Sequence, residues 1–263
     1  MLYPYFFKKL FLKSAIAIPA PRLLYRFCRL YNEAKDGENF GDMTINGEVR
    51  FLRSQAHDCH VLFDVGANRG EWTQHALAAT KEARIHCFEP LPSLFRTLLA
   101  NQFPRRVVCN QLGLSDETGE RQMDPTTTSL YDRRQNPDGN PGSSLTETVR
   151  LSTLDEYCAE HGVEQIDLLK LDVEGHELAV LRGGQKMIQE GRIKRIQFEY
   201  GPCNIDSRVL LRDLFTFFET LEYDVYKITP RKLVKLRAYD RRLENFQYKN
   251  FAALHPSLGA KRS

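Results

Sequence analysis

The sequence predicts an α/β fold in which a mostly parallel β-sheet is covered by helices on both faces. Short apolar runs alternate with helix-compatible segments between residues 61 and 220, and this alternation is typical of parallel sheets. Two of the apolar runs end beside a carboxylate, at Asp64 and at Glu89. The 263 residues, 42% hydrophobic and 27% charged, suffice for a globular domain with an ample core.

The first predicted unit is a strand at 61–65, a small-residue turn and a helix at 70–80. Gly66 and Gly70 let the backbone of the turn approach a ligand closely. The N-terminus of the following helix supplies free N–H groups for a carboxylate or a phosphate. This stretch therefore predicts a cofactor site. The alternative interpretation is an ordinary strand-turn-helix of an α/β protein.

The second unit is a strand at 84–88 that ends at Glu89, followed by a helix at 92–102. An acid at the end of the second strand is where doubly wound nucleotide-binding folds bind ribose hydroxyls. The nicotinamide fingerprint also needs three glycines. Here Asn68 and Glu71 stand at the second and third of those positions, which argues against a nicotinamide-dependent oxidoreductase.

The rest of the chain continues the alternation, with one interruption. Further strands are expected at 106–112, 166–171, 193–199, 223–228 and 246–254, and further helices at 175–190 and 207–220. The interval 117–150 is rich in Thr, Ser, Asn, Pro, Gly and Asp. We expect it to be a β-hairpin insertion with short β pieces at 126–129 and 146–151 and a long loop at 136–142. Loops of this length are typically functional or disordered.

Several motifs in combination resemble the FkbM-type methyltransferase family. They are D-x-G-x-N-x-G at 64–70, F-E-P at 88–90, I-D-L-L-K-L-D-V-E-G-H-E at 166–177 and V-L-R-G-G at 180–184. The resemblance runs from about residue 40 to residue 200. It implies a class I methyltransferase (Rossmann-like) fold, whose seven-stranded sheet has an antiparallel pair at one end. It also implies S-adenosylmethionine as cofactor and O-methylation of a hydroxyl on a sugar, a glycan or a secondary metabolite.

Ligands of open α/β sheets bind beyond the carboxyl ends of the strands, so we expect the cofactor-binding residues in the loops there. These are Asp64, Gly66, Ala67, Asn68, Gly70, Glu89, Ser115 and Asp116. We assign Glu89 to the two ribose hydroxyls, because one carboxylate can accept hydrogen bonds from both. Ser115 and Asp116 are expected to flank the adenine, although Asp116 could equally cap a turn.

The candidate catalytic residues follow the fourth and fifth strands: Asp172, Glu174, His176 and Glu199. An oxygen acceptor must lose a proton, and a positioned base accelerates that step by roughly 10²- to 10⁴-fold. His176 has the ordinary pKa closest to neutrality, whereas Glu174 and Glu199 would need a pKa raised by burial. The other interpretation is that His176 begins a helix and that Glu199 caps a sheet edge. The acids at 172–177 also suit Mg²⁺, but helix-dipole partners are the favoured interpretation, and no metal is predicted.

The N-terminal part is expected to be an amphipathic helical extension over 1–45, ahead of a methyltransferase domain over 46–263. Two helices are predicted, at about 4–17 and 20–35. Lysines interrupt the apolar stretch too often for a membrane span of about 20 apolar residues. Residues 1–40 hold seven Lys/Arg against three acids. Residues 1–35 are therefore expected either to pack on the domain or to touch a membrane surface.

Composition narrows the remaining choices of partner and compartment. Six scattered cysteines without a C-x-x-C motif indicate a reducing compartment, hence a cytoplasmic protein or one at the inner face of a membrane. A net charge of +3 does not imply nucleic acid, and we expect none as partner. The basic segment 227–242 could border a phosphate-bearing acceptor or form a solvated surface. A catalytically silent scaffold remains the main alternative function, and the oligomeric state is open.

Overall fold

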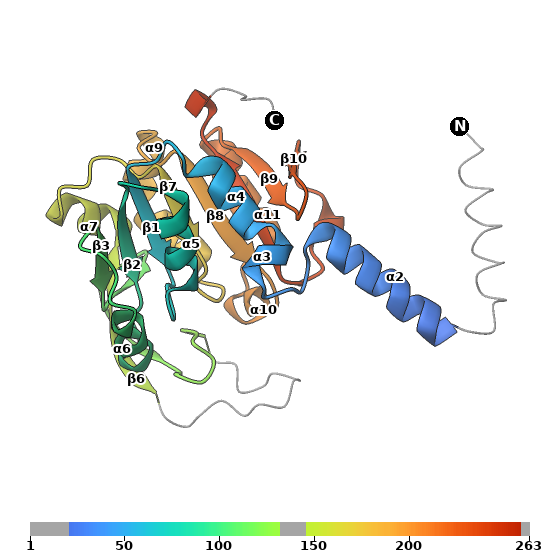
Figure 1. The fold of residues 1–263 in the computed structure, drawn as a ribbon, viewed down its shortest axis with the longest axis horizontal. Helices are drawn as coiled ribbons and strands as arrows, with labels where there is room; N and C mark the ends of the chain where they lie inside the picture. Colours follow the sequence, from blue (N-terminus) through green and yellow to red (C-terminus); the bar gives the residue numbers. More distant parts are fainter. Residues whose placement is uncertain (1–20, 132–145, 259–263) are drawn as a thin grey trace.

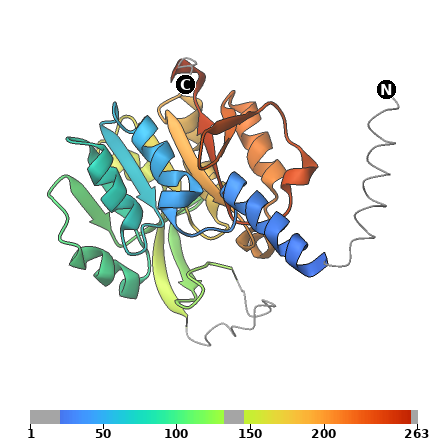
Figure 2. The same ribbon diagram turned by 45° about the vertical axis from the view of Figure 1, so that its right-hand side comes forward.

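The computed structural model describes residues 21–131 and 146–258. It has one large sheet with helices on both faces and a small second sheet beside it (Figures 1 and 2). The helix expected at 4–17 and the loop expected at 136–142 lie outside the described residues.

The large sheet has eight strands in the order β10-β9-β11-β8-β7-β1-β2-β3. Their bounds are β1 Val61–Val65, β2 Arg84–Phe88, β3 Val107–Asn110, β7 Leu168–Leu171, β8 Arg195–Tyr200, β9 Asp224–Ile228, β10 Leu233–Leu236 and β11 Lys249–Leu254. The strands from β3 to β8 in this order pair in parallel, whereas β11 is antiparallel to both β8 and β9. All seven predicted strands are present, and the sheet has the mostly parallel order with an antiparallel end that is expected of a class I methyltransferase.

The eighth strand, β10, is a correction to the predicted count of seven. It pairs antiparallel with β9 at the edge of the sheet. The sequence did not reveal it because it is short and lies within the basic segment 227–242. Charged side chains suit an edge strand, since they discourage pairing with another chain.

Helices alternate with the strands along the chain and cover both faces of the large sheet (Figure 1). Their bounds are α2 Pro21–Asp36, α3 Met43–Asn46, α4 Glu48–Gln55, α5 Glu71–Ala79, α6 Pro92–Ala100, α7 Leu154–Glu160, α8 Glu177–Gly183, α9 Gln185–Gln189, α10 Cys203–Ser207 and α11 Leu211–Thr220, with 3₁₀ turns at Arg241–Leu243 and Pro256–Leu258. The helix predicted at 175–190 is divided at Gly184 into α8 and α9. The helix predicted at 207–220 begins four residues later, as α11.

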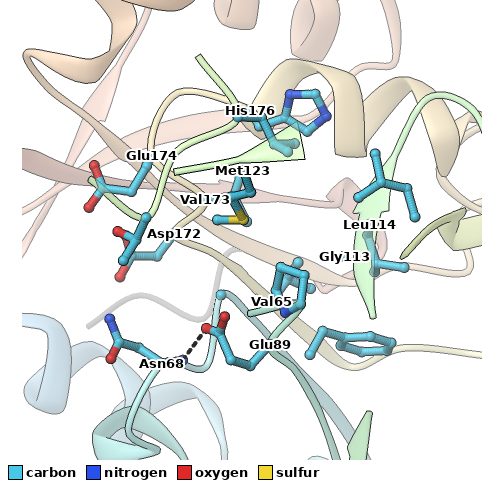
Figure 3. Close-up of a pocket in the computed structure, with 16 residues that line it drawn as sticks. Val65, Asn68, Glu89, Gly113, Leu114, Met123, Asp172, Val173, Glu174 and His176 are labelled. Carbon is cyan, nitrogen blue, oxygen red and sulfur yellow. Dashed lines mark hydrogen bonds between the residues drawn. The ribbon is translucent and has the colours of Figure 1, made fainter. Parts of the chain in front are cut away.

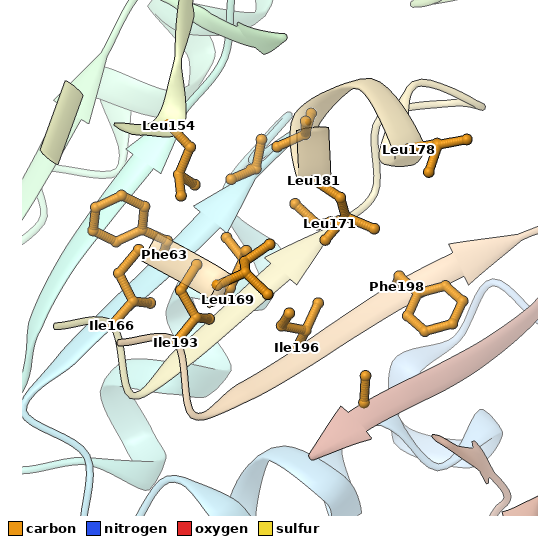
Figure 4. Packing of buried hydrophobic residues seen from close by; sticks show 14 of the residues in the cluster. Phe63, Leu154, Ile166, Leu169, Leu171, Leu178, Leu181, Ile193, Ile196 and Phe198 are labelled. Atoms are coloured by element: carbon orange, nitrogen blue, oxygen red, sulfur yellow. The ribbon is translucent and has the colours of Figure 1, made fainter. Parts of the chain in front are cut away.

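The core lies on both faces of the sheet because alternate strand residues point to opposite faces. Phe63 belongs to the larger cluster, which packs against α7, α8 and α11, whereas Leu62 belongs to a second cluster with Phe51 and Trp72 from α4 and α5. Figure 4 shows Phe63 with Ile196 and neighbouring apolar side chains of the larger cluster. Full burial of such side chains contributes about 1.5–3 kcal/mol each, so the sheet is a rigid platform for the loops at its edge.

The predicted insertion forms the second sheet, in the order β4-β6-β5. Its strands are β4 Gly113–Ser115, β5 Gly119–Met123 and β6 Glu147–Thr153. The β piece predicted at 146–151 is confirmed as β6, with β5 as its antiparallel partner. The one predicted at 126–129 is wrong: this segment is a turn, closed by a single bridge between Asp124 and Ser129. The Asp124 carboxylate accepts the Thr126 N–H, a side-chain bond that favours a turn.

Helix α2 confirms the helix predicted at 20–35 and extends away from the body of the protein (Figures 1 and 2). In its last turns Glu33 is buried, whereas the preceding residues 22–32 are exposed. Residues 39–46 then lie against the body, where Asn46 is buried. Within the described ranges, no helix is both long enough and apolar enough to cross a membrane. The boundary at residue 45 stays a prediction.

Candidate active site

A buried lysine joins the first and fourth predicted strands, β1 and β7. The two strands pair in parallel with Asp64 opposite Lys170. The Lys170 Nζ lies 3.0 Å from Asp64 Oδ1 and 3.3 Å from Asp172 Oδ2, and it donates to the Gly66 carbonyl at 3.1 Å. Burial lowers the pKa of Lys170, but the carboxylates of Asp64 and Asp172 outweigh that effect and raise it overall. The ammonium thus fixes the turn after β1 against the loop after β7.

The turn after β1 needs its glycine. Gly66 has φ +79°, and a Cβ there would lie 1.8 Å from the Asp172 carbonyl oxygen, so only glycine allows the two loops to meet this closely. Two residues on, Asn68 also has a positive φ of 49°. Its N–H donates to Glu89 Oε2 at 3.0 Å, a bond drawn in Figure 3.

Glu89 closes one side of a cavity at the carboxyl ends of β1 and β2. Its side chain is buried, and its other oxygen accepts the Leu91 N–H at 3.0 Å. Burial raises the pKa of Glu89, and the hydrogen bonds from Leu91 and Asn68 oppose that rise. Each carboxylate oxygen can accept a second hydrogen bond. The carboxyl group is therefore held in place with capacity left for a ligand.

The first cavity has one polar side and one apolar side (Figure 3). Its lining residues are Val65, Gly66, Asn68, Phe88, Glu89, Pro90, Gly113, Leu114, Met123, Thr128, Leu130, Leu151, Asp172, Val173, Glu174 and His176. The second sheet contributes much of the apolar side. The insertion that interrupts the alternation of strands and helices thus completes this cavity.

A second and larger cavity, of about 680 Å³, adjoins the first. It is lined by Asn39, Phe40, Gly41, Met43, Asn46, Glu48, Gly66, Ala67, Asn68, Arg69, Glu71, Trp72, Lys170, Asp172, Glu174, Glu199 and Tyr248. Four residues line both cavities: Gly66, Asn68, Asp172 and Glu174. The cavities therefore meet at the turn after β1 and the loop after β7.

Glu199 is a carboxyl group in this second cavity with no hydrogen bond or ion pair to another described residue. Burial raises its pKa well above the ordinary value, and the carboxylates of Asp172 and Glu174 raise it further. Glu48, at the start of α4, accepts hydrogen bonds from Asn46 Nδ2 and from Gln197 Nε2, both at 2.7 Å. Glu199 thus differs from Glu48 in having both oxygens available to a ligand.

Comparison with known proteins shows the family of this chain. A family model described as the methyltransferase FkbM domain matches residues 64–225, which is more than half of the chain. The chain belongs to the FkbM methyltransferase family. The match includes the turn after β1, both acids of the shared rim and Glu199.

Three curated relatives of this FkbM-family chain show the extent of the similarity. The hexuronic acid methyltransferase AglP of Haloferax volcanii is 29% identical over 167 residues, 63% of this chain and 66% of that protein. The 2-O-methyltransferase NoeI of Sinorhizobium fredii is 28% identical over 62% of this chain and 72% of its own. The 31-O-demethyl-FK506 methyltransferase FkbM of Streptomyces tacrolimicus is 32% identical over 47% of this chain and 58% of its own. The chain thus spans 58% to 72% of these relatives.

Among solved structures, the methyltransferase FkbM of Methylobacillus flagellatus KT is similar, with a TM-score of 0.49 and 18% identity. The similarity covers 76% of this chain and 44% of that one.

Four predicted site residues of this FkbM-family chain line neither cavity. Asp64 is fully buried, pairs with Lys170 and lines neither cavity. Gly70, with φ +87°, begins α5 behind the turn. Ser115 and Asp116 also line neither cavity; the Ser115 hydroxyl bonds to Asp116 Oδ1 at 3.1 Å and to His176 Nε2 at 2.9 Å. Direct cofactor contact by these four residues stays a prediction, and their visible contacts are supporting ones.

His176 lines the first cavity and is absent from the walls of the second. Both of its nitrogens are engaged, Nε2 with Ser115 and Nδ1 with the Tyr131 hydroxyl at 2.9 Å. Burial lowers the pKa of His176, and the negative charge of Asp116 partly offsets this. This arrangement favours Glu199 over His176 as a proton acceptor for a molecule in the second cavity.

The loop after β7 is held by Glu177, whose Oε1 accepts the N–H groups of Val173 and Gly175 at 3.1 and 3.3 Å. Between them, Glu174 has a left-handed backbone with φ +54°, a conformation that costs of order 1 kcal/mol or more in a residue with a side chain. The supporting bonds hold this carboxylate at the rim that the two cavities share. In the described part of the chain, no three His, Cys, Asp or Glu residues are grouped to hold a metal ion.

The sequence did not predict the cavity walls that lie away from the carboxyl ends of the strands. Glu48, Trp72 and Tyr248 line the second cavity, but none follows a parallel strand. Trp72 carried the clearest signal, since it is the single tryptophan of the chain and lies two residues after Gly70. Its indole Nε1 is buried without a partner among the described residues.

Proposed function

We propose that this chain transfers the methyl group of S-adenosylmethionine to a hydroxyl of a sugar, a glycan or a secondary metabolite. The observation that carries the proposal is the meeting of two cavities at Asp172 and Glu174, with the Glu199 carboxyl, which has no hydrogen bond or ion pair within the described ranges, in the larger one. One cavity suits a nucleoside, and the other suits an acceptor with exchangeable protons. Methyl transfer to a hydroxyl needs both sites to share one rim.

The first cavity fits an adenosyl group. Glu89 is a fixed carboxylate with lone pairs left for two ribose hydroxyls, and Pro90, Leu114 and Met123 offer apolar surface to a flat base. Gly66 brings the backbone close to the rim. When bound, the sulfonium cofactor supplies an electrophilic methyl group and departs as a neutral thioether that needs no proton.

We assign two tasks to the residues of this chain. The walls of the second cavity hold the acceptor in line with the shared rim, and such positioning can contribute up to about 7–11 kcal/mol. Glu199 accepts the proton of the reacting hydroxyl, because its raised pKa makes its carboxylate a stronger base than an exposed one. Asp172 and Glu174 then orient the other hydroxyls of the acceptor at the rim.

The walls of the second cavity suit a polyhydroxylated ring. Trp72 and Tyr248 supply aromatic surface, while Asn39 and Asn46 supply amides beside the carboxylates. Hydroxyl groups can both donate to and accept from such a set. Two of the curated relatives are described as a hexuronic acid methyltransferase and a 2-O-methyltransferase, which supports a sugar as the acceptor.

Transfer of labelled methyl from S-adenosylmethionine to a panel of sugars, glycosides and hydroxylated macrolides tests the assignment. The wild type is expected to methylate a member of the panel. Glu199→Gln should then lower kcat by about 10²- to 10⁴-fold with unchanged affinity for S-adenosylhomocysteine. Glu219→Gln, the same change at an exposed site on α11, is the control. Normal kcat in Glu199→Gln, or an equal loss in His176→Asn, would refute Glu199 as the base.

Other functions receive less support from the site. A catalytically silent scaffold needs no carboxyl like that of Glu199, which lacks a partner in the described part of the chain and lies beside the first cavity. A nicotinamide cofactor is disfavoured by Asn68 and Glu71 at the positions of two fingerprint glycines. The basic segment 227–242, a candidate border for a phosphate, has cations in ion pairs at Lys227, Lys235 and Arg242, so we propose no nucleic acid partner.

We further propose a cytoplasmic location with peripheral contact at the inner face of a membrane through residues 1–35. All six cysteines are free, as suits a reducing compartment. The sequence predicts that the helix at 20–35 either packs on the domain or touches a membrane surface. Only the end of α2 is buried against the domain, so the rest of the helix is available to a membrane surface.

A further inference from the structure

Helix α2 carries a continuous apolar stripe that is exposed. Its members are Leu23, Leu24, Phe27, Leu30 and Tyr31, each at least 49% exposed. Their spacing of one, three or four residues places them on one face of an α-helix. More than half of the strongly exposed large apolar residues of the described chain lie on this one helix. Apolar surface of this kind marks an interaction site.

The opposite face of α2 is basic. Arg22, Arg26 and Arg29 follow each other at intervals of three and four residues, and Glu33 on the same face is buried against the body. Arg29 pairs with Glu33, while Arg22 and Arg26 make no ion pair within the described residues. An apolar stripe bordered by cations is the pattern of helices that lie in the surface of an anionic bilayer.

The end of α2 is fixed to the large sheet. The Lys227 Nζ lies 2.8 Å from Glu38 and 3.3 Å from Asp36, and the Lys249 Nζ lies 3.4 Å from Glu38. Lys227 belongs to β9 and Lys249 to β11. These buried contacts set the direction in which the helix leaves the body, so its apolar stripe has a defined orientation to the active site.

The same junction forms a wall of the second cavity. The Asn39 amide donates to Glu33 at 3.0 Å, and the Asn39 N–H donates to the Tyr248 carbonyl at 2.9 Å. Asn39 and Tyr248 both line the cavity. Asn39 lies three positions after Asp36, the end of α2, which is at most about 11 Å of chain. Whatever surface α2 lies on is therefore close to the acceptor cavity.

We infer that α2 lies in the surface of an anionic bilayer and that the acceptor is a hydroxylated headgroup carried on a lipid at that surface. The second half of this inference rests on the proposed methyl transfer; the first half does not. Lipid is favoured over a second copy of the chain because a copy paired through the apolar stripe would leave Arg22 and Arg26 on the outer face, where neither has an anionic partner among the described residues. Phosphate headgroups instead complement these cations.

Co-sedimentation of the full chain with vesicles tests the surface. We expect binding to vesicles of equal parts phosphatidylglycerol and phosphatidylcholine, and weak binding to phosphatidylcholine alone. Leu23→Asp/Phe27→Asp should reduce binding at least tenfold. Leu99→Asp/Ile205→Asp, which places the same charges at exposed apolar residues of the body, should leave it unchanged. Unchanged vesicle binding in Leu23→Asp/Phe27→Asp would overturn the inference. It would also be overturned if the wild type formed a dimer without binding vesicles and this variant were a monomer.

The acceptor is tested with a glycolipid panel in the same vesicles and with the corresponding free headgroup sugars. Methylation of the vesicle-borne acceptor should fall at least tenfold in the α2 variant, while methylation of the free sugar stays unchanged. Equal loss on both would overturn the lipid-borne acceptor. Titration with S-adenosylhomocysteine separates the two proposals. If the chain binds S-adenosylhomocysteine but not vesicles, only this inference is refuted. If it binds vesicles but not S-adenosylhomocysteine, the proposed methyl transfer is refuted.

Discussion

Replacement of Lys170 by methionine probes the buried contact that joins the two loops of the active site. Methionine keeps the length of the side chain but removes the ammonium. Asp64 is fully buried and keeps only the Thr73 hydroxyl, at 2.7 Å, as a side-chain donor. Loss of one partner of a buried ion pair costs about 3–5 kcal/mol. For a chain of this size the melting temperature should fall by roughly 6–20 °C.

Urea unfolding with a double-mutant cycle measures this effect. Asp64→Asn/Lys170→Met removes the two buried charges and should recover most of the stability lost in Lys170→Met, because the remaining carboxylate, Asp172, is 41% exposed and can be solvated. Lys235→Met is the control, since its pair with Asp224 is half exposed and is expected to contribute at most about 1 kcal/mol. A loss below about 1 kcal/mol in Lys170→Met, or no recovery in the double variant, would refute the reasoning.

Two further predictions concern carboxyl groups of the site. Glu89→Gln should weaken binding of S-adenosylhomocysteine by roughly 10- to 150-fold in calorimetry, because charge-assisted hydrogen bonds are worth about 1.5–3 kcal/mol; wild-type affinity would contradict the ribose assignment. Burial raises the pKa of Glu177 from 4.5 to about 7, so the protonated form stabilises the fold below pH 4.5 and that stability is lost as the pH rises through 7. Glu177→Gln should therefore reduce the fall in unfolding free energy between pH 4.5 and pH 7 by up to about 3 kcal/mol. An unchanged fall in this variant would contradict the role assigned to the Glu177 carboxyl.

The sequence predicted the inner strands because their signals are local. The strands expected at 61–65 and 84–88 have these bounds in the structure, since strands buried on both faces are short apolar runs. Gly66, Asn68 and Glu89 were predicted at the cavity for the same reason: they directly follow such strands.

What the sequence could not predict depends on contacts between distant segments. Glu48 reaches the second cavity because α4 packs near β8, where Gln197 donates to it across 149 positions of chain. Met123 and Leu151 reach the first cavity because β5 pairs with β6. The bonds of the Ser115 hydroxyl to Asp116 and to His176 likewise depend on which way β4 turns, and the adenine contacts of Ser115 and Asp116 stay predictions. Edge strand β10 was missed because its four residues lack a long apolar run.

Calorimetric titration with S-adenosylhomocysteine, and with NADH as comparison, tests the central claim most directly. We expect stoichiometric binding of S-adenosylhomocysteine and no binding of NADH, because the first cavity offers the Glu89 carboxylate and the turn after β1 lacks the glycine fingerprint of a dinucleotide site. Binding of NADH, or of neither ligand, would contradict it.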